Sequence, residues 1–475
     1  ADLFYTPQGK DGNTDASVQK CALTIPAGST LRLSDLLSSY FSASGTGQIE
    51  LRSASTGALS LRTTVESTTG GDPTTKYGTE IPTVSYGSGV GLGGGILAVP
   101  GIDDDAVRRA NLILAETRGA SATAVVTVYD SNGGVVGTKP YFLPAYGKVQ
   151  VDRVVNDVSP GATLSGGWLS VSVSSGSGRV IPVATVIDNR SNSFSAVLGQ
   201  GPPAQLAGSA GGIQALAAAP LKFIVPAAVR ARGAFTQFVT DLKVVNPTGA
   251  PANLTLTYNY IDLEDGNLVK SVQRPVTIPA RGSLSAAFSN DVISSLFNVT
   301  NQSKGSITFE GSVGQVAAAA AISAQVDPAD PSKGVKTAQI NRSFLDSPDI
   351  LASGSPEVRF AGCEKSIQKR TSLIVLEVDG GSCAVKVKGI TTTGELLAER
   401  SFNITPGQYF QIVDLFGADG LNLGDGPFQN VEVSVQVVSG SGRVIALSTV
   451  NDNISQNPEI FVLQVPGSTG PTIGF

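Results

Sequence analysis

Short runs of alternating apolar and polar residues dominate the chain. Ala122 to Tyr129 is typical, and it ends in the turn-forming sequence Asp130 to Gly133. Side chains of a strand point alternately to opposite faces, so this period of two predicts half-buried strands rather than helices. The runs span about five to eight residues and the turns recur about every 8–12 residues, a spacing typical of antiparallel β-sandwiches.

One hairpin sequence occurs twice. Ser175 to Ile181 and Ser439 to Ile445 share the sequence Ser-Gly-Ser-Gly-Arg-Val-Ile at an offset of 264 residues, and the match continues to Asp188-Asn189 and Asp452-Asn453. Strands traced upstream from these hairpins, and from a related pattern between them, predict an all-β chain of four tandem antiparallel β-sandwich domains. Their bounds are residues 1–95, 96–205, 206–345 and 346–475.

Further elements are expected at fixed places in this pattern. A short apolar strand precedes repeats two to four, at Ile96 to Pro100, Phe223 to Pro226 and Val358 to Phe360. Short helical segments are expected at Ser34 to Tyr40 and Asn290 to Phe297, because each run opens with a side chain able to cap a helical turn.

The first repeat lacks its opening strand. Leu3, Phe4 and Tyr5 match the second strand of the other repeats. In repeats two and four the opening strand starts 24 residues before the glycine of the turn that follows the second strand. Gly12 is the equivalent glycine of the first repeat, and the same spacing ends about 12 residues ahead of Ala1.

An incomplete sandwich leaves unpaired backbone groups beside an open core, and such an edge invites another strand. Three explanations remain open. A local segment such as Val84 to Val99 fills the place, a strand from another copy of the chain fills it, or the chain has been trimmed at its start. In the second case Leu3, Phe4 and Tyr5 form the candidate acceptor edge.

A donor strand for such an exchange must come from a free end. Ile460 to Val465 is predicted as the last strand of the fourth repeat, and Gly467 to Phe475 beyond it carries no charged side chain. Ile473 and Phe475 are the candidate contacts between subunits. Pro471 removes one backbone donor from this tail, which weakens its pairing.

The composition favours an exported protein without catalytic activity. The chain has no Met, so Ala1 is expected to follow a removed secretory signal. It also has no His, which removes the commonest general base and a frequent zinc ligand and excludes Ser–His–Asp chemistry. We therefore expect no enzyme and no small-molecule substrate.

Charge and hydropathy argue against nucleic acid as a partner of the chain and against a membrane span. The net charge is −5 and no basic face stands out, which argues against nucleic acid. No apolar run approaches about 18 residues, so no membrane span is predicted.

The three cysteines allow one disulfide. Cys363 and Cys383 flank what the pattern predicts as adjacent strands of repeat four, so a disulfide between them is predicted in an exported protein. Cys21 is left over, either as a buried free thiol or as a link to another chain.

No resident cofactor is expected, although calcium is considered at three acidic clusters. These are Asp103 to Asp105, Asp262 to Asp265 and Asp419 to Asp425. Calcium favours carboxylate oxygens in such loops, but Asp, Asn and Gly are also ordinary turn residues.

A family resemblance rests on the third repeat. Phe223 to Pro226, Thr240 to Leu242 and Val245 to Pro247 resemble tandem Ig-like β-sandwich repeats of exported bacterial surface proteins. The resemblance extends loosely to repeats two and four. It implies an extracellular or cell-surface location and a scaffolding role, and it supplies no functional residues.

These observations predict a structural subunit of an extracellular filament or surface layer. The subunit would self-associate head to tail into a homopolymer by β-strand complementation of the incomplete first domain. The alternative is a cell-surface adhesin or an array of carbohydrate-binding modules. A filament subunit should form regular polymers when purified, whereas an adhesin should remain monomeric and bind a ligand.

Overall fold

The computed structural model describes the chain apart from several short segments. These are residues 27–28, 54–60, 62, 69–75, 82, 202–220, 234–235, 285–290, 312–315, 326–328, 331–332, 334, 342, 345–349, 454–457, 463–471 and 475. No helix in the described part is long and apolar enough to cross a membrane.

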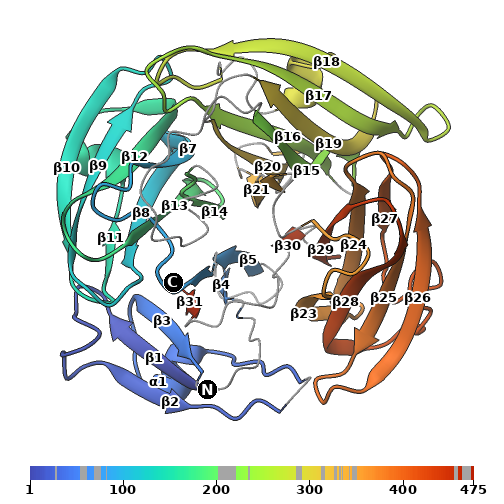
Figure 1. Cartoon of the computed structure of the whole chain (residues 1–475), viewed down its shortest axis with the longest axis horizontal. Coiled ribbons are helices and arrows are strands. Elements are labelled where there is room, and N and C mark those ends of the chain that lie inside the picture. Colours follow the sequence, from blue (N-terminus) through green and yellow to red (C-terminus); the bar gives the residue numbers. More distant parts are fainter. Residues whose placement is uncertain are drawn as a thin grey trace.

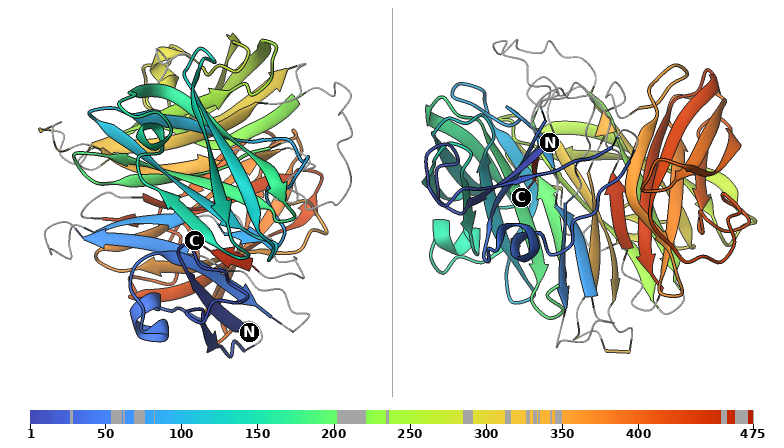
Figure 2. Two further views of the ribbon diagram at one scale, coloured as in Figure 1. Left: turned by 90° about the vertical axis from the view of Figure 1, so that its left-hand side faces the viewer. Right: turned by 90° about the horizontal axis from the view of Figure 1, so that it is seen from below.

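The chain is all-β, as the alternating pattern predicts, and its antiparallel sheets form four groups around a common centre (Figure 1). We call these groups sectors 1 to 4, in chain order. In the view from below (Figure 2, right), sectors 2 and 4 stand on opposite sides with sector 1 in front.

Sector 1 holds the first strands of the chain and also its last strand. Its elements are β1 (Asp2–Pro7), β2 (Gln19–Ala22), α1 (Leu36–Phe41), β3 (Gly47–Arg52), β4 (Thr63–Thr68), β5 (Lys76–Ile81), β6 (Val84–Ser85) and β31 (Thr472–Gly474).

Sector 2 contains two four-stranded sheets. Its elements are β7 (Leu97–Asp104), β8 (Arg108–Glu116), β9 (Ala122–Tyr129), β10 (Val135–Leu143), β11 (Lys148–Val151), α2 (Val154–Val158), β12 (Leu164–Gly176), β13 (Val180–Asp188) and β14 (Phe194–Leu198).

Sector 3 follows with longer strands. Its elements are β15 (Leu221–Arg232), β16 (Gln237–Val245), β17 (Ala252–Asp262), β18 (Leu268–Ile278), α4 (Val292–Ser295), β19 (Ser303–Gly311), β20 (Ala317–Gln325), β21 (Val335–Asn341) and β22 (Ser343–Phe344).

Sector 4 repeats the layout of sector 2. Its elements are β23 (Val358–Lys365), β24 (Lys369–Glu377), β25 (Cys383–Ile390), β26 (Leu396–Ile404), β27 (Tyr409–Ile412), β28 (Phe428–Gly440), β29 (Val444–Asp452) and β30 (Pro458–Val462).

The strand order recurs from sector to sector. Sector 2 has the orders β10-β9-β12-β7 and β11-β8-β13-β14, and sector 4 has the matching orders β26-β25-β28-β23 and β27-β24-β29-β30. In sector 3 the order β18-β17-β19-β15 continues through β16, β20 and β21, because the long strand β15 pairs with both β19 and β16. The predicted entry strands are β7, β15 and β23.

The alternating sequence builds the core. In β9 every second side chain is buried, and Val126 and Val128 belong to one hydrophobic cluster with Leu112 and Leu114 of β8 in the other sheet. The cluster of sector 3 also takes in Leu376 of sector 4, so the apolar core continues across that boundary.

The sectors meet at the centre through equivalent strands. β5 contacts β14, β14 contacts β21, β21 contacts β30, and β30 contacts β5, which closes a ring (Figure 1). Sector 1 also touches sector 4 farther out. Thr30 Oγ1 donates to Glu432 at 2.8 Å, and Arg32 Nη1 donates to Asn430 Oδ1 at 2.9 Å.

The single tryptophan joins sectors 2 and 3. Trp168 is fully buried, and its ring stacks on Tyr129 with the centroids 4.2 Å apart. Its Nε1 donates to the backbone oxygen of Arg281 at 2.7 Å. Val245 and Ala317 of sector 3 complete the small apolar cluster around it.

We expect Trp168→Phe to lower the free energy of unfolding by about 1–3 kcal/mol, because it leaves the backbone oxygen of Arg281 without this donor. Urea unfolding followed by circular dichroism measures the change. Tyr40→Phe, at a half-exposed ring, is the control and should stay within about 0.5 kcal/mol of the parent. Equal stability of the two variants would contradict the importance of this contact.

Candidate assembly site

The last strand of the chain lies in the first sector. β31 pairs antiparallel with β3, with Leu51 opposite Thr472, Glu50 opposite Ile473 and Ile49 opposite Gly474. On its other side it pairs antiparallel with β6. The sheet therefore runs β2-β1-β3-β31-β6.

The position of β31 is the one that entry strands occupy elsewhere. β3 matches β12, β19 and β28, because each lies beside the strand equivalent to β1. The far neighbours of these three strands are β7, β15 and β23, whereas the far neighbour of β3 is β31. The C-terminal strand thus supplies from the same chain a strand that sector 1 does not draw from its own N-terminal segment.

The expected acceptor edge at Leu3, Phe4 and Tyr5 needs correction. These residues lie in β1, which is paired on one side with β2 and on the other with β3, so β1 offers no free edge. Leu3 and Tyr5 are buried in the sector 1 core, and Phe4 lies under the guanidinium of Arg52 at 4.2 Å. The edge that receives a strand belongs to β3.

The two tail candidates have different outcomes. Ile473 lies in β31 and pairs with Glu50 of the same chain, so here it makes a contact within the chain. Phe475 lies outside the described residues.

The local segment Val84 to Val99 contributes only its first residues to this sheet. Val84 and Ser85 form β6, which flanks β31. Val90 and Leu92 instead bridge to sector 2. The opening strand identified by counting matches β8, β16 and β24. In the described part of sector 1 no strand lies there, since β4 pairs with β5 alone.

An ion pair sits on the acceptor strand. Glu50 is 3% exposed, and its carboxylate accepts two hydrogen bonds from Arg52, at 2.8 and 2.7 Å. The hydrogen bond to Glu50 raises the pKa of Arg52. The Arg52 guanidinium also lies 4.8 Å from the ring of Tyr146, which ties the acceptor strand to sector 2.

The predicted disulfide is not formed. None of Cys21, Cys363 and Cys383 takes part in a disulfide. Cys363 pairs with Val431 and Cys383 with Gly440 on the opposite edges of β28, nine positions apart, which is about 30 Å along a strand. A disulfide needs Cα atoms within about 7 Å, so these two cysteines lie too far apart to form one. Their strands, β23 and β25, flank β28 rather than each other.

Two of the acidic clusters are engaged in ion pairs. Asp103 accepts from the Gly166 backbone at 2.6 Å and from Arg108 at 3.0 Å, and Asp104 accepts from Arg153 at 2.5 Å. In the second cluster Lys270 binds both Asp262 and Asp265, at 2.9 and 2.6 Å. The third cluster, Asp419 to Asp425, has exposed carboxylates at both ends.

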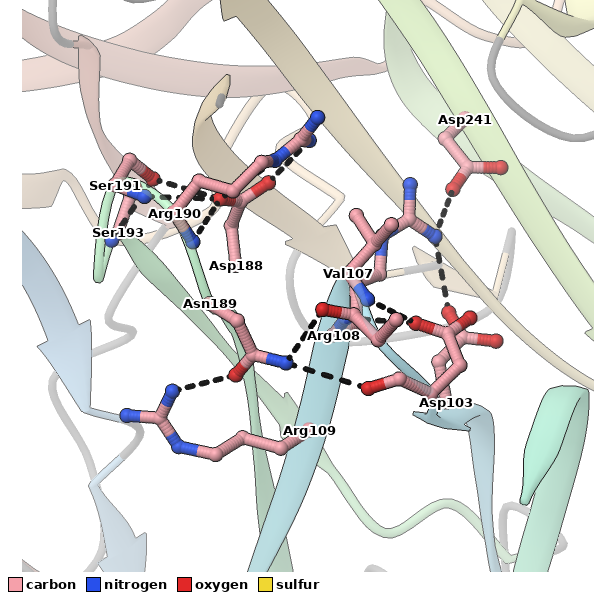
Figure 3. Close-up of polar contacts among 12 residues, drawn as sticks. Asp103, Val107, Arg108, Arg109, Asp188, Asn189, Arg190, Ser191, Ser193 and Asp241 are labelled. Atoms are coloured by element: carbon pink, nitrogen blue, oxygen red, sulfur yellow. Dashed lines mark hydrogen bonds and ion pairs between the residues drawn. The ribbon is translucent and has the colours of Figure 1, made fainter. Parts of the chain in front are cut away.

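In the described part of the chain, no group of three or more His, Cys, Asp or Glu side chains is placed to hold a metal ion. Arg108 also lies 4.0 Å from Asp241 of sector 3 (Figure 3). Burial opposes its charge, but Asp103 and Asp241 outweigh that effect and raise the pKa of Arg108. The first acidic cluster therefore helps to join two sectors.

The recurrent Asp-Asn pairs have a structural role. Asn189 accepts from Arg109 at 2.6 Å and donates to the backbone oxygen of Asp105 (Figure 3). In sector 4 Asn453 accepts from Arg370 in the same way. Each asparagine thus secures the turn between the entry strand and the strand that follows it.

A buried glutamate recurs at the ends of the equivalent strands β8 and β24, and the sequence pattern did not single it out. Glu116 is fully buried, and its carboxylate accepts from the backbone N–H groups of Arg118, Gly119, Ala120, Tyr146 and Arg179, at 2.7–3.2 Å. These donors come from three separate turns. One carboxylate therefore ties together the turns that join β8 to β9, β10 to β11 and β12 to β13.

Sector 4 uses the same device. Glu377 is 2% exposed and accepts from the backbone N–H groups of Asp379, Gly380, Gly381 and Gly407. In sector 3 the matching position is Asn246, also buried, which bonds the backbone of the turns at Ala250 and Pro279. The signal was present in the sequence. Glu116, Asn246 and Glu377 each lie seven positions after the residue that begins the opening strand in the aligned repeats, which is Arg109, Val239 and Arg370 respectively.

The recurrent Ser-Gly-Ser-Gly hairpin packs against the turns that these glutamates hold. A Cβ on Gly178 would lie 2.1 Å from the backbone oxygen of Ala120, and one on Gly442 would lie 2.5 Å from that of Gly381. Only glycine fits so close to another backbone. The repeated sequence is therefore a packing requirement of the fold.

Comparisons with known proteins show no family. No family model matches the chain, and no curated protein matches it. Among solved structures, a calcium-binding mutant of β-glucuronidase 2 from Bacteroides uniformis aligns over 60% of this chain and 33% of its own, at 12% identity and a TM-score of 0.13. The chain thus spans about a third of that protein.

Two further solved structures are similarly distant. Dimeric latent PorU from Porphyromonas gingivalis aligns over 72% of this chain and 29% of its own, at 12% identity and a TM-score of 0.16. The VP2 subviral particle of infectious bursal disease virus aligns over 78% of this chain and 80% of its own, at 10% identity and a TM-score of 0.12. TM-scores this low do not indicate a shared fold.

We expect Glu116→Ala and Glu377→Ala each to lower the free energy of unfolding by at least about 3 kcal/mol, because each leaves several buried backbone donors unpaired. Chemical denaturation measures the loss. Glu395→Ala, at an exposed glutamate, is the matched control and should change stability by less than about 0.5 kcal/mol. A loss no larger than the control's would show that the carboxylates do not secure the turns.

Lys148 predicts a pH dependence. It is 4% exposed, and burial lowers its pKa to about 8, below its value of about 10.4 in an unfolded chain. Between these two pH values the unfolded chain binds more protons, so the contribution of Lys148 to stability rises with pH. Below pH 8 Lys148 is charged in both the folded and the unfolded state, and burial of the charge then destabilises the folded state by its full amount.

Lys148→Met should remove this rise and stabilise the protein at pH 7, by up to about 3 kcal/mol. The measurement is the difference in free energy of unfolding between parent and variant from pH 7 to 10. The exposed Lys10→Met is the control, with a difference that should stay flat over this range. A flat difference for Lys148→Met as well would refute the prediction.

Proposed function

We propose that the four sectors are tandem β-sandwich domains and that the protein is a non-enzymatic structural subunit of an extracellular filament or surface layer. The observation that supports this proposal most directly is that β31 lies beside β3, at the position that an entry strand occupies in the other sectors. A first domain completed by the opposite end of the chain has the two parts that head-to-tail assembly needs, a donor strand and an acceptor edge.

The geometry of exchange favours an open polymer. If the β31 of one copy pairs with the β3 of the next, each copy uses its own end as donor and its own sector 1 as acceptor. These are two different surfaces, so the contact is heterologous and produces chains unless the rotation happens to close a ring.

The chemistry of the chain supports a structural role. Its sequence contains no His, and the described carboxylates of the first two acidic clusters bind Arg, Lys and backbone groups. The recurrent polar residues Glu116, Glu377 and Asn189 hold turns. The expected extracellular location follows from the composition and the family resemblance.

Electron microscopy of the purified, concentrated protein tests the proposal. We expect regular polymers from the intact chain and their loss when residues 472–475 are removed, because the acceptor edge then has no donor. Deletion of the exposed Ile367 side chain, as Ile367→Ala, is a control that should leave polymers intact. Monomers that bind carbohydrate at every concentration would favour an adhesin instead.

A further inference from the structure

The end of the chain is held by a small number of interactions. β31 is in register with three residues of β3 and two of β6. By comparison, β7 pairs with β12 at six positions between Leu164 and Val171, with two shifts of register. A backbone hydrogen bond contributes about 0.5–1.5 kcal/mol net, so the three-residue strand is held far less firmly than its counterparts.

Among the described residues, the backbone partners of β31 are β3 and β6, which both lie in sector 1. The chain reaches it from β30 of sector 4, and nine residues separate Val462 from Thr472. Every pairing of β31 can therefore be made equally well with the β3 and β6 of a second copy. The exchange requires no new contact surface.

The ring does not depend on β31 for its closure. The bonds from Thr30 to Glu432 and from Arg32 to Asn430 join sectors 1 and 4 independently, as do the contacts of β5 with β30. Release of β31 would thus uncover the edges of β3 and β6 while the four sectors remain together.

We propose that β31 is a self-capping strand, which blocks the acceptor edge of its own chain and is exchanged for the β31 of a second copy during assembly. This inference rests on the proposed function and adds its regulation. A short tether gives an intramolecular strand an effective concentration in the millimolar range. Isolated chains at micromolar concentration therefore stay capped, and exchange requires a high local concentration.

A disulfide staple in the full-length chain tests the capping. In a background with Cys21, Cys363 and Cys383 replaced by Ser, the double substitution Ser85→Cys and Thr472→Cys introduces cysteines at two positions that pair between β6 and β31. We expect the oxidised protein to remain monomeric at concentrations where the parent polymerises, and reduction to restore assembly. The single variant Ser85→Cys is the control. Polymers formed by the oxidised monomer would overturn the proposal.

A synthetic peptide of residues 467–475 tests the acceptor without polymerisation. Ile473→Pro in the full-length chain removes a backbone donor of β31 and should uncap the edge, whereas Thr469→Pro lies outside β31 and should not. We expect the labelled peptide to bind the Ile473→Pro chain at least tenfold more tightly than the Thr469→Pro chain. Equal binding to both, or binding to neither, would refute self-capping.

Two readouts keep the tests independent. Unchanged Trp168 fluorescence and thermal unfolding confirm that the Ile473→Pro chain is folded. Selective peptide binding without polymers at any concentration would support self-capping and contradict the filament. Polymers from the stapled chain would be consistent with the filament proposal and would show that exchange of β31 is not what forms the polymers.

Discussion

Backbone pairing at the edge of β3 is the constraint on which the arrangement of this protein depends. A strand that lies at the edge of a sheet beside a buried core must find a partner, because buried and unpaired backbone groups are costly. In sectors 2, 3 and 4 the partner is the entry strand that begins the same sector. In sector 1 it is β31, from the other end of the chain. Because β31 takes the place of an entry strand, the first and last strands of the chain lie in one sheet.

Within each sector, buried polar groups set the positions of the turns. Glu116 and Glu377 gather backbone N–H groups from several loops, and Asn246 does similar work in sector 3. A carboxylate in such a site is stable only because each oxygen is fully hydrogen-bonded. The hairpin glycines Gly178 and Gly442 then fit closely against the same turns. The recurrent polar residues of the sequence are thus framework residues.

Contacts between the sectors are as specific as those within them. Trp168 is buried between sectors 2 and 3, and Arg108 reaches from Asp103 toward Asp241 across the same boundary. The core of sector 3 continues into sector 4 through Leu376. These contacts make the ring a packed unit, in which the sectors hold one another in a fixed orientation. They restrict the relative motion that domains joined only by linkers would have.

The sequence by itself determined the strands, because a period of two depends only on which face of a sheet each side chain meets. It predicted the entry strands β7, β15 and β23 and the short helices near Leu36 and Val292. The role of Glu116 was also present in the repeat spacing, although it became evident only from its hydrogen bonds.

The tertiary structure alone decided which strands are neighbours. The order of strands in a sheet depends on contacts between residues far apart in the chain, and local patterns carry no record of them. For that reason Cys363 and Cys383 were expected to be close, whereas they lie on opposite edges of β28. Likewise β1 was expected to have an open edge, whereas β2 and β3 pair with it on both sides. The partner of β31 is the plainest case, since Ile473 and Glu50 are separated by most of the chain and meet only because the ring closes.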